Sequence, residues 1–368
     1  MKEFYTRTGP QMNKLNILVF SAPYLPVPPL KYGGTERVIF NIVKGLSAYC
    51  NIKLIGTGDS DVPCELLELV DKHLFFALTE EDRDSHDKLV FNTDIKFREH
   101  ILSHCNWVDL YHSHFNRHTN ILREMMEEGV VPERPILTTL HGGYSVEQQE
   151  FFDLNGHLHF NSISDNQRQA YPESINWAGT VYNSVDTSDF PLNMHPEDYV
   201  CFLGRFDPEK YPHKAIEIAS AWGIKLKLAG KIDHFGETYF KEKIEPLIDG
   251  DKVEFLGELA VKEKSDLLRN ALINLHPTNF RDPFGLTICE AACSGTPTLA
   301  IRKGALPELI EQGRTGFCVE DFEEGIKHFD KLVHMKRKYI SVRAKMLFDI
   351  ETMSEEYLEL YKSILSKY

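Results

Sequence analysis

Short runs of β-branched and aromatic residues alternate with segments of helical hydrophobic spacing along almost the whole chain. Strands that alternate with helices are typical of a parallel sheet covered on both faces. The strand-like runs form a first series at 15–20, 51–56, 73–78, 108–114, 136–142, 160–164 and 179–183, and a second at 199–205, 225–230, 253–258, 272–278, 296–302 and 316–320. The sequence therefore predicts an α/β protein with two doubly wound, Rossmann-like domains.

The break between the two series, residues 184–198, is rich in turn-forming residues and is interpreted as the interdomain linker. A length of 368 residues agrees with two domains, because a single core rarely keeps growing beyond about 300 residues. We expect a flexible N-terminal tail at 1–11, an N-terminal domain at 12–190 and a C-terminal domain at 191–350. The segment 351–368 has helical spacing and is expected to return towards the N-terminal domain.

The net charge argues against nucleic acid as a partner, and the number and spacing of the cysteines indicate the cellular compartment. An excess of 55 acidic over 41 basic residues gives a net charge of −14, and such a surface repels a nucleic-acid backbone. Residues 1–11 lack the apolar segment of a signal peptide, and no window approaches the roughly 18 apolar residues of a membrane span. Seven cysteines without paired metal-knuckle spacing favour a reducing compartment. We expect a cytoplasmic protein, with peripheral contact at the inner membrane surface left open.

Ligands of open α/β sheets bind where strands end and helices begin, because helix N-termini carry unpaired N–H groups. The first strand leads to Gly33 and Gly34, just before a helix expected near Thr35. Either these glycines let the backbone approach a phosphate or sugar closely, or they merely allow the chain to turn.

A second strand end brings two cations close in sequence, Arg205 and Lys210, ahead of an expected helix. Fixed positive charge in a partly dry cleft stabilises the negative charge that develops on a departing diphosphate. The alternative is an ordinary solvated ion pair with the neighbouring Asp207 and Glu209.

The stretch HPTNFRDPFGLTICEAACSGTPTLA places Asp282 before a glycine turn and Glu290 on the helix that follows. Carboxylates accept hydrogen bonds from the hydroxyls of a ribose or hexose, and the free amides of Phe284, Gly285 and Leu286 can face a phosphate or sugar oxygen. The alternative makes Asp282 a helix cap and Glu290 a surface charge.

PFGLTICEAACSGTP with Asp282 ahead of it resembles the signature of the retaining glycosyltransferase family 4, and GRFDPEK resembles that family's donor-phosphate motif. GGTERV, LHG at 140–142, VYNSVD and GALPELIEQGRTGFCV follow the family's order along nearly the whole chain. The resemblance implies a GT-B fold, in which two Rossmann-like domains face each other across a donor cleft. No cofactor and no metal are expected.

The family pattern also implies roles for individual residues. Four are implied to be catalytic: Arg205 and Lys210 at the diphosphate, His141 at the donor sugar and Asp282 at the sugar hydroxyls. Six are implied to bind the donor: Gly33, Gly34, Phe284, Gly285, Leu286 and, at the nucleotide ribose, Glu290. Three positions depart from the pattern, since the family usually has Glu at Asp282 and Gly at Ser184 and Tyr211. The shorter Asp282 leaves the donor sugar in doubt.

Other polar residues carry weaker hypotheses. His112, His114 and His118 follow one strand, where a metal site is one interpretation and packing or acceptor contact is the other. Asp109 is either an acceptor-side base or a structural residue.

The basic run 327–345 is either a solvated helix face or a stripe for anionic lipid. In the second case, the apolar residues near the cleft would also meet the lipid-linked acceptor: Tyr24, Leu25, Val27 and Leu30.

The predicted function is transfer of a hexose from a nucleoside-diphosphate sugar to a hydroxyl of a glycan, glycolipid or metabolite, with retention of configuration. A UDP-sugar is the first expectation and GDP-mannose the second. A dehydrogenase is disfavoured because no G-x-G-x-x-G follows the first strand. A non-catalytic nucleotide-sugar-binding subunit and a sugar-nucleotide epimerase remain as alternatives.

Overall fold

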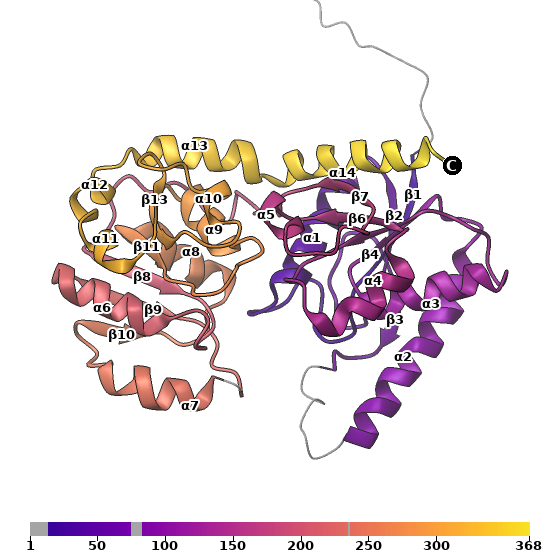
Figure 1. The fold of residues 1–368 in the computed structure, drawn as a ribbon, viewed down its shortest axis with the longest axis horizontal. Helices are drawn as coiled ribbons and strands as arrows, with labels where there is room; N and C mark the ends of the chain where they lie inside the picture. The colour runs from indigo at the N-terminus through magenta and orange to yellow at the C-terminus, as the bar shows by residue number, and fades with distance from the viewer. Residues whose placement is uncertain (1–13, 75–82, 235) are drawn as a thin grey trace, which may run out of the picture.

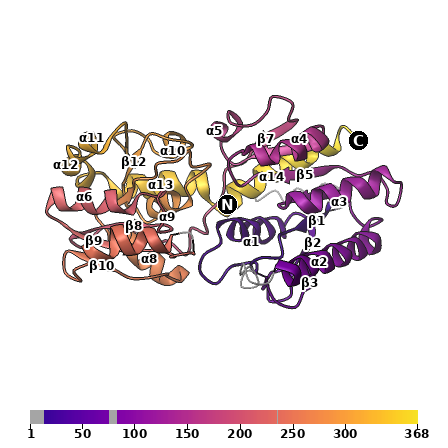
Figure 2. The same ribbon diagram turned by 60° about the horizontal axis from the view of Figure 1, so that its bottom comes forward.

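The computed structural model describes residues 14–74, 83–234 and 236–368, which form two lobes side by side (Figures 1 and 2). The tail expected at 1–11, and most of the strand expected at 73–78, lie outside the described residues.

The first lobe is a parallel sheet with helices on both faces. Its strands are β1 (Asn16–Phe20), β2 (Asn51–Thr57), β3 (Glu65–Val70), β4 (Leu110–Ser113), β5 (Ile136–Thr139), β6 (His159–Ser162) and β7 (Trp177–Thr180). Its helices are α1 (Gly34–Leu46), α2 (Arg83–His104), α3 (Asn116–Glu127), η3 (Val146–Gln148), α4 (Gln149–Asn155) and α5 (Asp165–Arg168). The described strands are ordered β3-β2-β1-β4-β5-β6-β7.

The second lobe repeats this plan. Its strands are β8 (Tyr199–Leu203), β9 (Lys225–Ala229), β10 (Val253–Phe255), β11 (Ile273–His276), β12 (Thr298–Ile301) and β13 (Gly316–Val319). Its helical segments are α6 (Pro212–Trp222), α7 (Glu237–Tyr239), η4 (Phe240–Ile244), η5 (Glu245–Leu247), α8 (Val261–Asn270), α9 (Leu286–Cys293), α10 (Leu306–Leu309), α11 (Phe322–Ile326), α12 (Phe329–Val333) and α13 (Arg337–Phe348). The order is β10-β9-β8-β11-β12-β13. The predicted pair of doubly wound sheets is confirmed.

Both sheets are buried on both faces, which explains the continuous apolar runs of the central strands. In β1, Ile17 and Val19 pack towards α1, whereas Leu18 and Phe20 pack towards α2 and α3. The same alternation divides β8, where Cys201 and Phe202 enter the cores on opposite faces. Hydrophobic cores therefore cover both faces of each sheet.

The C-terminal helices cross from one lobe to the other along one side of the molecule (Figure 1). Helix α13 packs on α9 of the second lobe, and α14 (Ile350–Leu365) packs on α1 of the first. The approach of α14 to α1 is close: a Cβ on Gly45 would lie 1.9 Å from the Ser354 hydroxyl oxygen. Between α13 and α14, Asp349 pairs with Val185, so the chain crosses between the lobes at two adjacent places.

The basic run at 327–345 is not a uniform stripe. The Arg337 guanidinium turns inward and donates to the carbonyls of Asn193 and Ala271 at 2.5 and 3.0 Å. Arg343 donates to the carbonyl of Leu309. Arg337 is therefore buried and takes no part in a solvated or lipid-facing stripe, whereas Arg343 is partly exposed.

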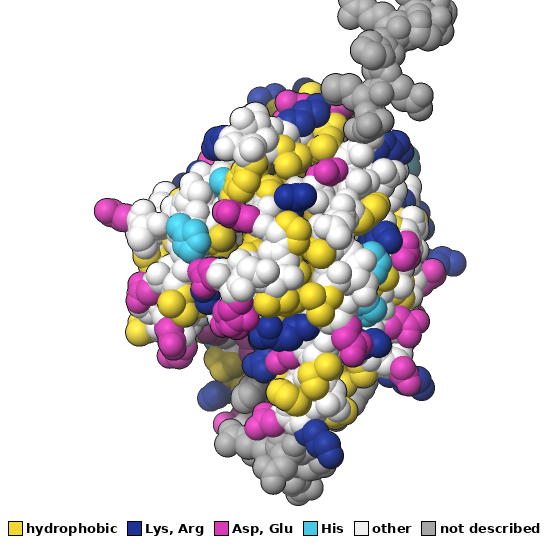
Figure 3. Space-filling model, turned by 90° about the vertical axis from the view of Figure 1, so that its right-hand side faces the viewer, with side chains coloured by type: hydrophobic (Ala, Val, Ile, Leu, Met, Phe, Trp, Pro, Cys, Tyr) yellow, Lys and Arg dark blue, Asp and Glu magenta, His cyan; other side chains and the backbone are white. Residues whose placement is uncertain are grey.

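The surface carries mixed charge. At the outer end of the first lobe, acidic and basic side chains are interspersed with apolar ones (Figure 3). Among the helices of the described residues, none combines the length and the apolar character needed to cross a bilayer.

Candidate active site

A pocket of about 520 Å³ lies between the two lobes. Residues of both lobes line it, at the carboxyl ends of β1, β5, β8 and β11, where open α/β sheets bind ligands. All ten residues that the family pattern assigns to catalysis or donor binding contribute: Gly33, Gly34, His141, Arg205, Lys210, Asp282, Phe284, Gly285, Leu286 and Glu290. The structure therefore brings the ten positions into one cavity, although they span some 250 residues of sequence.

The loop after β1 needs its first glycine. Gly33 precedes α1 with φ 143°, and a Cβ there would lie 2.7 Å from the Cβ of Pro29. Both facts exclude an ordinary side chain at this position. The adjacent Tyr32 N–H donates to a Glu258 carboxylate oxygen at 2.9 Å, which ties this loop of the first lobe to the second lobe.

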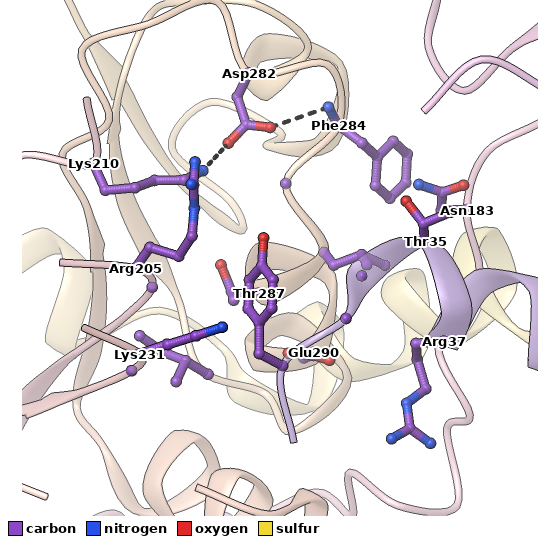
Figure 4. Close-up of a pocket in the computed structure, with 18 of the residues that line it drawn as sticks. Thr35, Arg37, Asn183, Arg205, Lys210, Lys231, Asp282, Phe284, Thr287 and Glu290 are labelled. Atoms are coloured by element: carbon purple, nitrogen blue, oxygen red, sulfur yellow. Dashed lines mark hydrogen bonds and ion pairs between the residues drawn. The ribbon is translucent and has the colours of Figure 1, made fainter. Parts of the chain in front are cut away.

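The two cations enter the pocket from the loop after β8, and Figure 4 shows their side chains close together. Arg205 lies 3.2 Å from Asp207 and 3.5 Å from Asp233. The Asp207 carboxylate also accepts from the backbone N–H of Lys210 at 2.9 Å and so orders the loop. Lys210 then reaches Asp282, with Nζ 2.7 Å from Oδ2. The solvated ion pair with Asp207 or Glu209, considered from the sequence, is therefore wrong for the Lys210 side chain.

Asp282 is a buried, ionised carboxylate. Burial alone raises its pKa, but Lys210 and the His276 ring, whose Nε2 is 3.5 Å away, outweigh burial and hold the pKa well below its usual range. The carboxylate also accepts from the Phe284 N–H at 3.3 Å, while Gly285 occupies the cap position of α9. Asp282 is therefore part of a charged cluster rather than a simple helix cap.

Glu290 differs from the surface charge of the alternative interpretation. Its side chain is only 6% exposed, and one carboxylate oxygen pairs with Lys264. The other oxygen, Oε2, is buried and receives no hydrogen bond from any described residue. A buried acceptor without a donor is costly, so this oxygen is suited to a ligand that brings a hydroxyl.

Tyr211, one of the three departures from the family pattern, has a backbone conformation that favours glycine. Tyr211 caps α6 with φ 55°, in the left-handed region that favours glycine. A tyrosine there costs on the order of 1 kcal/mol. Its ring lies 4.7 Å from that of His213, centre to centre.

The predicted grouping of His112, His114 and His118 is only partly correct. His112 and His114 lie together with ring centres 4.2 Å apart, but His118 belongs to another core, where its ring stacks on Phe97. The third member of the group is instead His141, whose Nε2 is 2.9 Å from Nδ1 of His114. Across the described residues, no three His, Cys, Asp or Glu side chains are placed to hold a metal ion.

Burial of four histidines predicts a pH-dependent stability. Burial lowers the pKa of His112 and His118 to about 3 and of His141 to about 4, and it places that of His114 well below its usual range. These groups stay neutral in the folded chain, whereas the unfolded chain protonates them below about pH 6.5. The unfolded state then binds more protons, so the free energy of unfolding falls as pH decreases from 7 to 5, by about 1–2 kcal/mol per histidine. Urea unfolding across this range measures the slope.

His118→Phe is the matched variant, because both nitrogens of His118 lack partners among the described residues and its ring packs on Phe97. The slope should become shallower by about 1.4 kcal/mol per pH unit. An unchanged slope would show that His118 is protonated in the folded protein.

Sequence reasoning missed several pocket residues, among them Lys264, His276 and Glu258. Lys264 lies on α8, in a stretch without a motif, and its pairing with Glu290 is a tertiary contact. His276 is the last residue of β11. Because ligands of open α/β sheets bind at the carboxyl ends of strands, its position could have identified it as a candidate.

Residues 186–346 match the family model described as "Glycosyl transferases group 1". Over 194 residues the chain is 24% identical to the O-antigen chain mannosyltransferase RfbU of Salmonella typhimurium, covering 51% of this chain and 54% of that protein. Over 164 residues it is 30% identical to the sulfoquinovosyl transferase SQD2 of Arabidopsis thaliana, covering 41% of this chain and 32% of that protein. The match thus spans about half or less of the length of these relatives.

Solved structures resemble the whole chain. Anabaena Alr3699/HepE in complex with UDP and glucose has a TM-score of 0.71 at 19% identity, with 95% of this chain and all of that chain covered. The sucrose-phosphate synthase of Thermosynechococcus elongatus has a TM-score of 0.77 at 16% identity, with 96% and 100% covered. The predicted GT-B fold is confirmed, and the second lobe is similar to the group 1 glycosyl transferases.

Proposed function

We propose that this protein is a retaining glycosyltransferase of the family 4 type, which moves a hexose from a nucleoside-diphosphate sugar to a hydroxyl acceptor without a metal ion. The observation that carries the proposal is the pairing of two features within one interdomain pocket. Arg205 and Lys210 converge at one side, and Glu290 presents at another a buried oxygen that has no donor among the described residues. A diphosphate and a ribose need these two kinds of partner.

The cations stabilise the leaving group. As the bond between the anomeric carbon and the phosphate oxygen breaks, its electron pair moves to the diphosphate, and Arg205 and Lys210 neutralise the charge that develops. Lys210 has three N–H donors, so it can keep its contact with Asp282 while it binds a phosphate oxygen.

The acceptor hydroxyl attacks from the face that the diphosphate leaves, which retains the configuration. Its oxygen forms the new bond to the anomeric carbon, and its proton passes to the departing phosphate oxygen. This step needs no separate strong base, so we assign none. Asp282, kept ionised by Lys210, accepts from hydroxyls of the transferred sugar.

The donor is proposed to be a UDP-hexose, with GDP-mannose as the second choice. The neighbour solved with UDP and glucose supports the first, and the relative named a mannosyltransferase supports the second. The acceptor is a glycan, glycolipid or small metabolite selected by the first lobe, and the reaction is placed in the cytoplasm or at the inner membrane surface.

Donor hydrolysis tests the proposal directly. Purified protein is incubated separately with UDP-glucose, UDP-galactose, UDP-N-acetylglucosamine and GDP-mannose, and released nucleotide is measured by mass spectrometry. We expect release from one donor and its loss in Arg205→Ala. If none of the four donors releases nucleotide, and neither UDP nor GDP stabilises the protein thermally, the proposal is contradicted and a non-catalytic role is favoured.

A further inference from the structure

His141 is the one imidazole that the family resemblance placed at the donor sugar, and hydrogen bonds fix the loop that carries it. The loop that carries it is held by Gln167, whose amide donates to the carbonyls of Leu140 and Gly142 at 2.9 and 2.7 Å. The Tyr171 hydroxyl donates to the same Gly142 carbonyl at 3.1 Å. One ring nitrogen of His141, Nε2, faces His114. The other, Nδ1, contacts no hydrogen-bonding partner among the described residues and belongs to a side chain that lines the pocket.

Behind this pair lies a closed hydrogen-bond network centred on Thr139. The Thr139 hydroxyl donates to the Asn161 side-chain oxygen at 2.6 Å, which uses its only proton. It therefore accepts from Nε2 of His112, 2.7 Å away. Nδ1 of His112 is then an acceptor and receives the hydroxyl proton of Tyr361 at 2.7 Å. Helix α14, which carries Tyr361, thus fixes the protonated nitrogen and the orientation of the His112 ring.

The fixed His112 ring supports His114 and offers it no hydrogen bond. The two ring centres are 4.2 Å apart, and His114 is only 8% exposed. Burial lowers the pKa of both His114 and His141, so each ring is neutral and carries a single N–H. One of the pair donates to the other across the 2.9 Å contact.

The direction of the hydrogen bond between His114 and His141 is inferred from Nε2 of His114. Nε2 of His114 is buried and has no partner among the described residues. If His114 carried its proton there, the fold would bury an unpaired N–H; among backbone groups such donors are rarer than acceptors left without a donor, and we apply the same preference to this ring. The proton of His114 therefore sits on Nδ1 and is donated to Nε2 of His141. The proton of His141 is then on Nδ1, the nitrogen left for the pocket.

We propose that His114 is a positioning residue, which holds His141 in the Nδ1–H form so that His141 presents a hydrogen-bond donor to an oxygen of the donor sugar. This inference rests on the proposed function for the identity of the ligand, but the protonation pattern does not. It also assigns His141 a role as a donor and excludes it as a base through that nitrogen.

The protonated nitrogen can be read without any activity. In protein labelled with 15N-histidine, two-bond correlations at neutral pH distinguish Nδ1–H from Nε2–H rings, and the His141 signals are identified by their loss in His141→Asn. We expect His141 to be protonated on Nδ1. Protonation on Nε2 would overturn the inference even if donor hydrolysis succeeds, and the spectrum remains decisive if no donor is turned over.

Two variants of His114 separate positioning from packing. His114→Asn keeps an N–H close to the Nδ1 position, and we expect it to preserve both the Nδ1–H form and turnover within a few-fold. His114→Leu removes the donor, so we expect His141 to lose its single tautomer and turnover to fall about tenfold, while affinity for UDP, which lacks the sugar, stays unchanged. Equal turnover in the two variants would overturn the inference. If the leucine variant fails to fold, the wild-type and asparagine spectra still decide.

Discussion

Lys210→Ala is expected to lower the rate of donor turnover by roughly 10² to 10³, the usual effect of removing one group that stabilises transition-state charge. Arg205→Ala should act similarly, because both cations line the same part of the pocket. Single-turnover release of nucleotide from the donor identified in the screen measures both effects. Lys214→Ala is the control. Lys214 lies in α6, four residues after Lys210, pairs with Glu217 and does not line the pocket.

The Lys210 variant also leaves the Asp282 carboxylate with the His276 ring and the Phe284 N–H as its partners among the described residues. An uncompensated buried charge destabilises a protein, so loss of activity and loss of stability must be separated. Adding Asp282→Asn to Lys210→Ala removes the charge and should restore the melting temperature without restoring turnover. Near-normal turnover of both Lys210→Ala and Arg205→Ala would refute the assignment of these cations to the diphosphate.

Arg337→Met is expected to lower the free energy of unfolding by about 3–5 kcal/mol, because it leaves several buried acceptors without a donor and each such group costs roughly 1–3 kcal/mol. The guanidinium donates to the carbonyls of Asn193, Ala271 and Arg269 and to the Thr296 hydroxyl, at 2.5 to 3.0 Å. Methionine fills part of the volume but leaves these acceptors without a donor. Urea unfolding followed by circular dichroism measures the loss.

Lys338→Met is the matched control for this prediction, because Lys338 is the next residue and its side chain is exposed. Its effect should stay within about 0.5 kcal/mol. Equal stability of the two variants would show that the Arg337 contacts contribute little.

The fold was predictable where hydrophobic spacing alone determines it. The central strands of both sheets are buried on both faces and read as continuous apolar runs, and their positions agree with the expected ranges. Strand β3 was missed because its sequence, ELLELV, carries two glutamates. It lies at the edge of the first sheet, where charged residues discourage pairing with another chain.

Ten of the residues that line the pocket were predicted, but the contacts among them were not. Glycines and charged residues at strand ends, together with the family resemblance, marked ten positions that meet in one pocket. The sequence assigned Lys210 and Asp282 to different parts of the donor, and only the three-dimensional arrangement shows that they form an ion pair. The pairing of Glu290 with Lys264 joins two helices in the same way. Such contacts depend on tertiary distances, which no local pattern contains.

The position of α14 has a consequence for how this protein is made. Met353, Tyr357 and Tyr361 complete the core on one face of the first sheet, together with residues of α1 and β1. The ribosome synthesises these residues only after the entire second lobe. The first lobe therefore emerges with part of an apolar face uncovered, and it can close that face only after the second lobe has been made. Apolar surface that stays exposed during synthesis makes a nascent chain prone to aggregation.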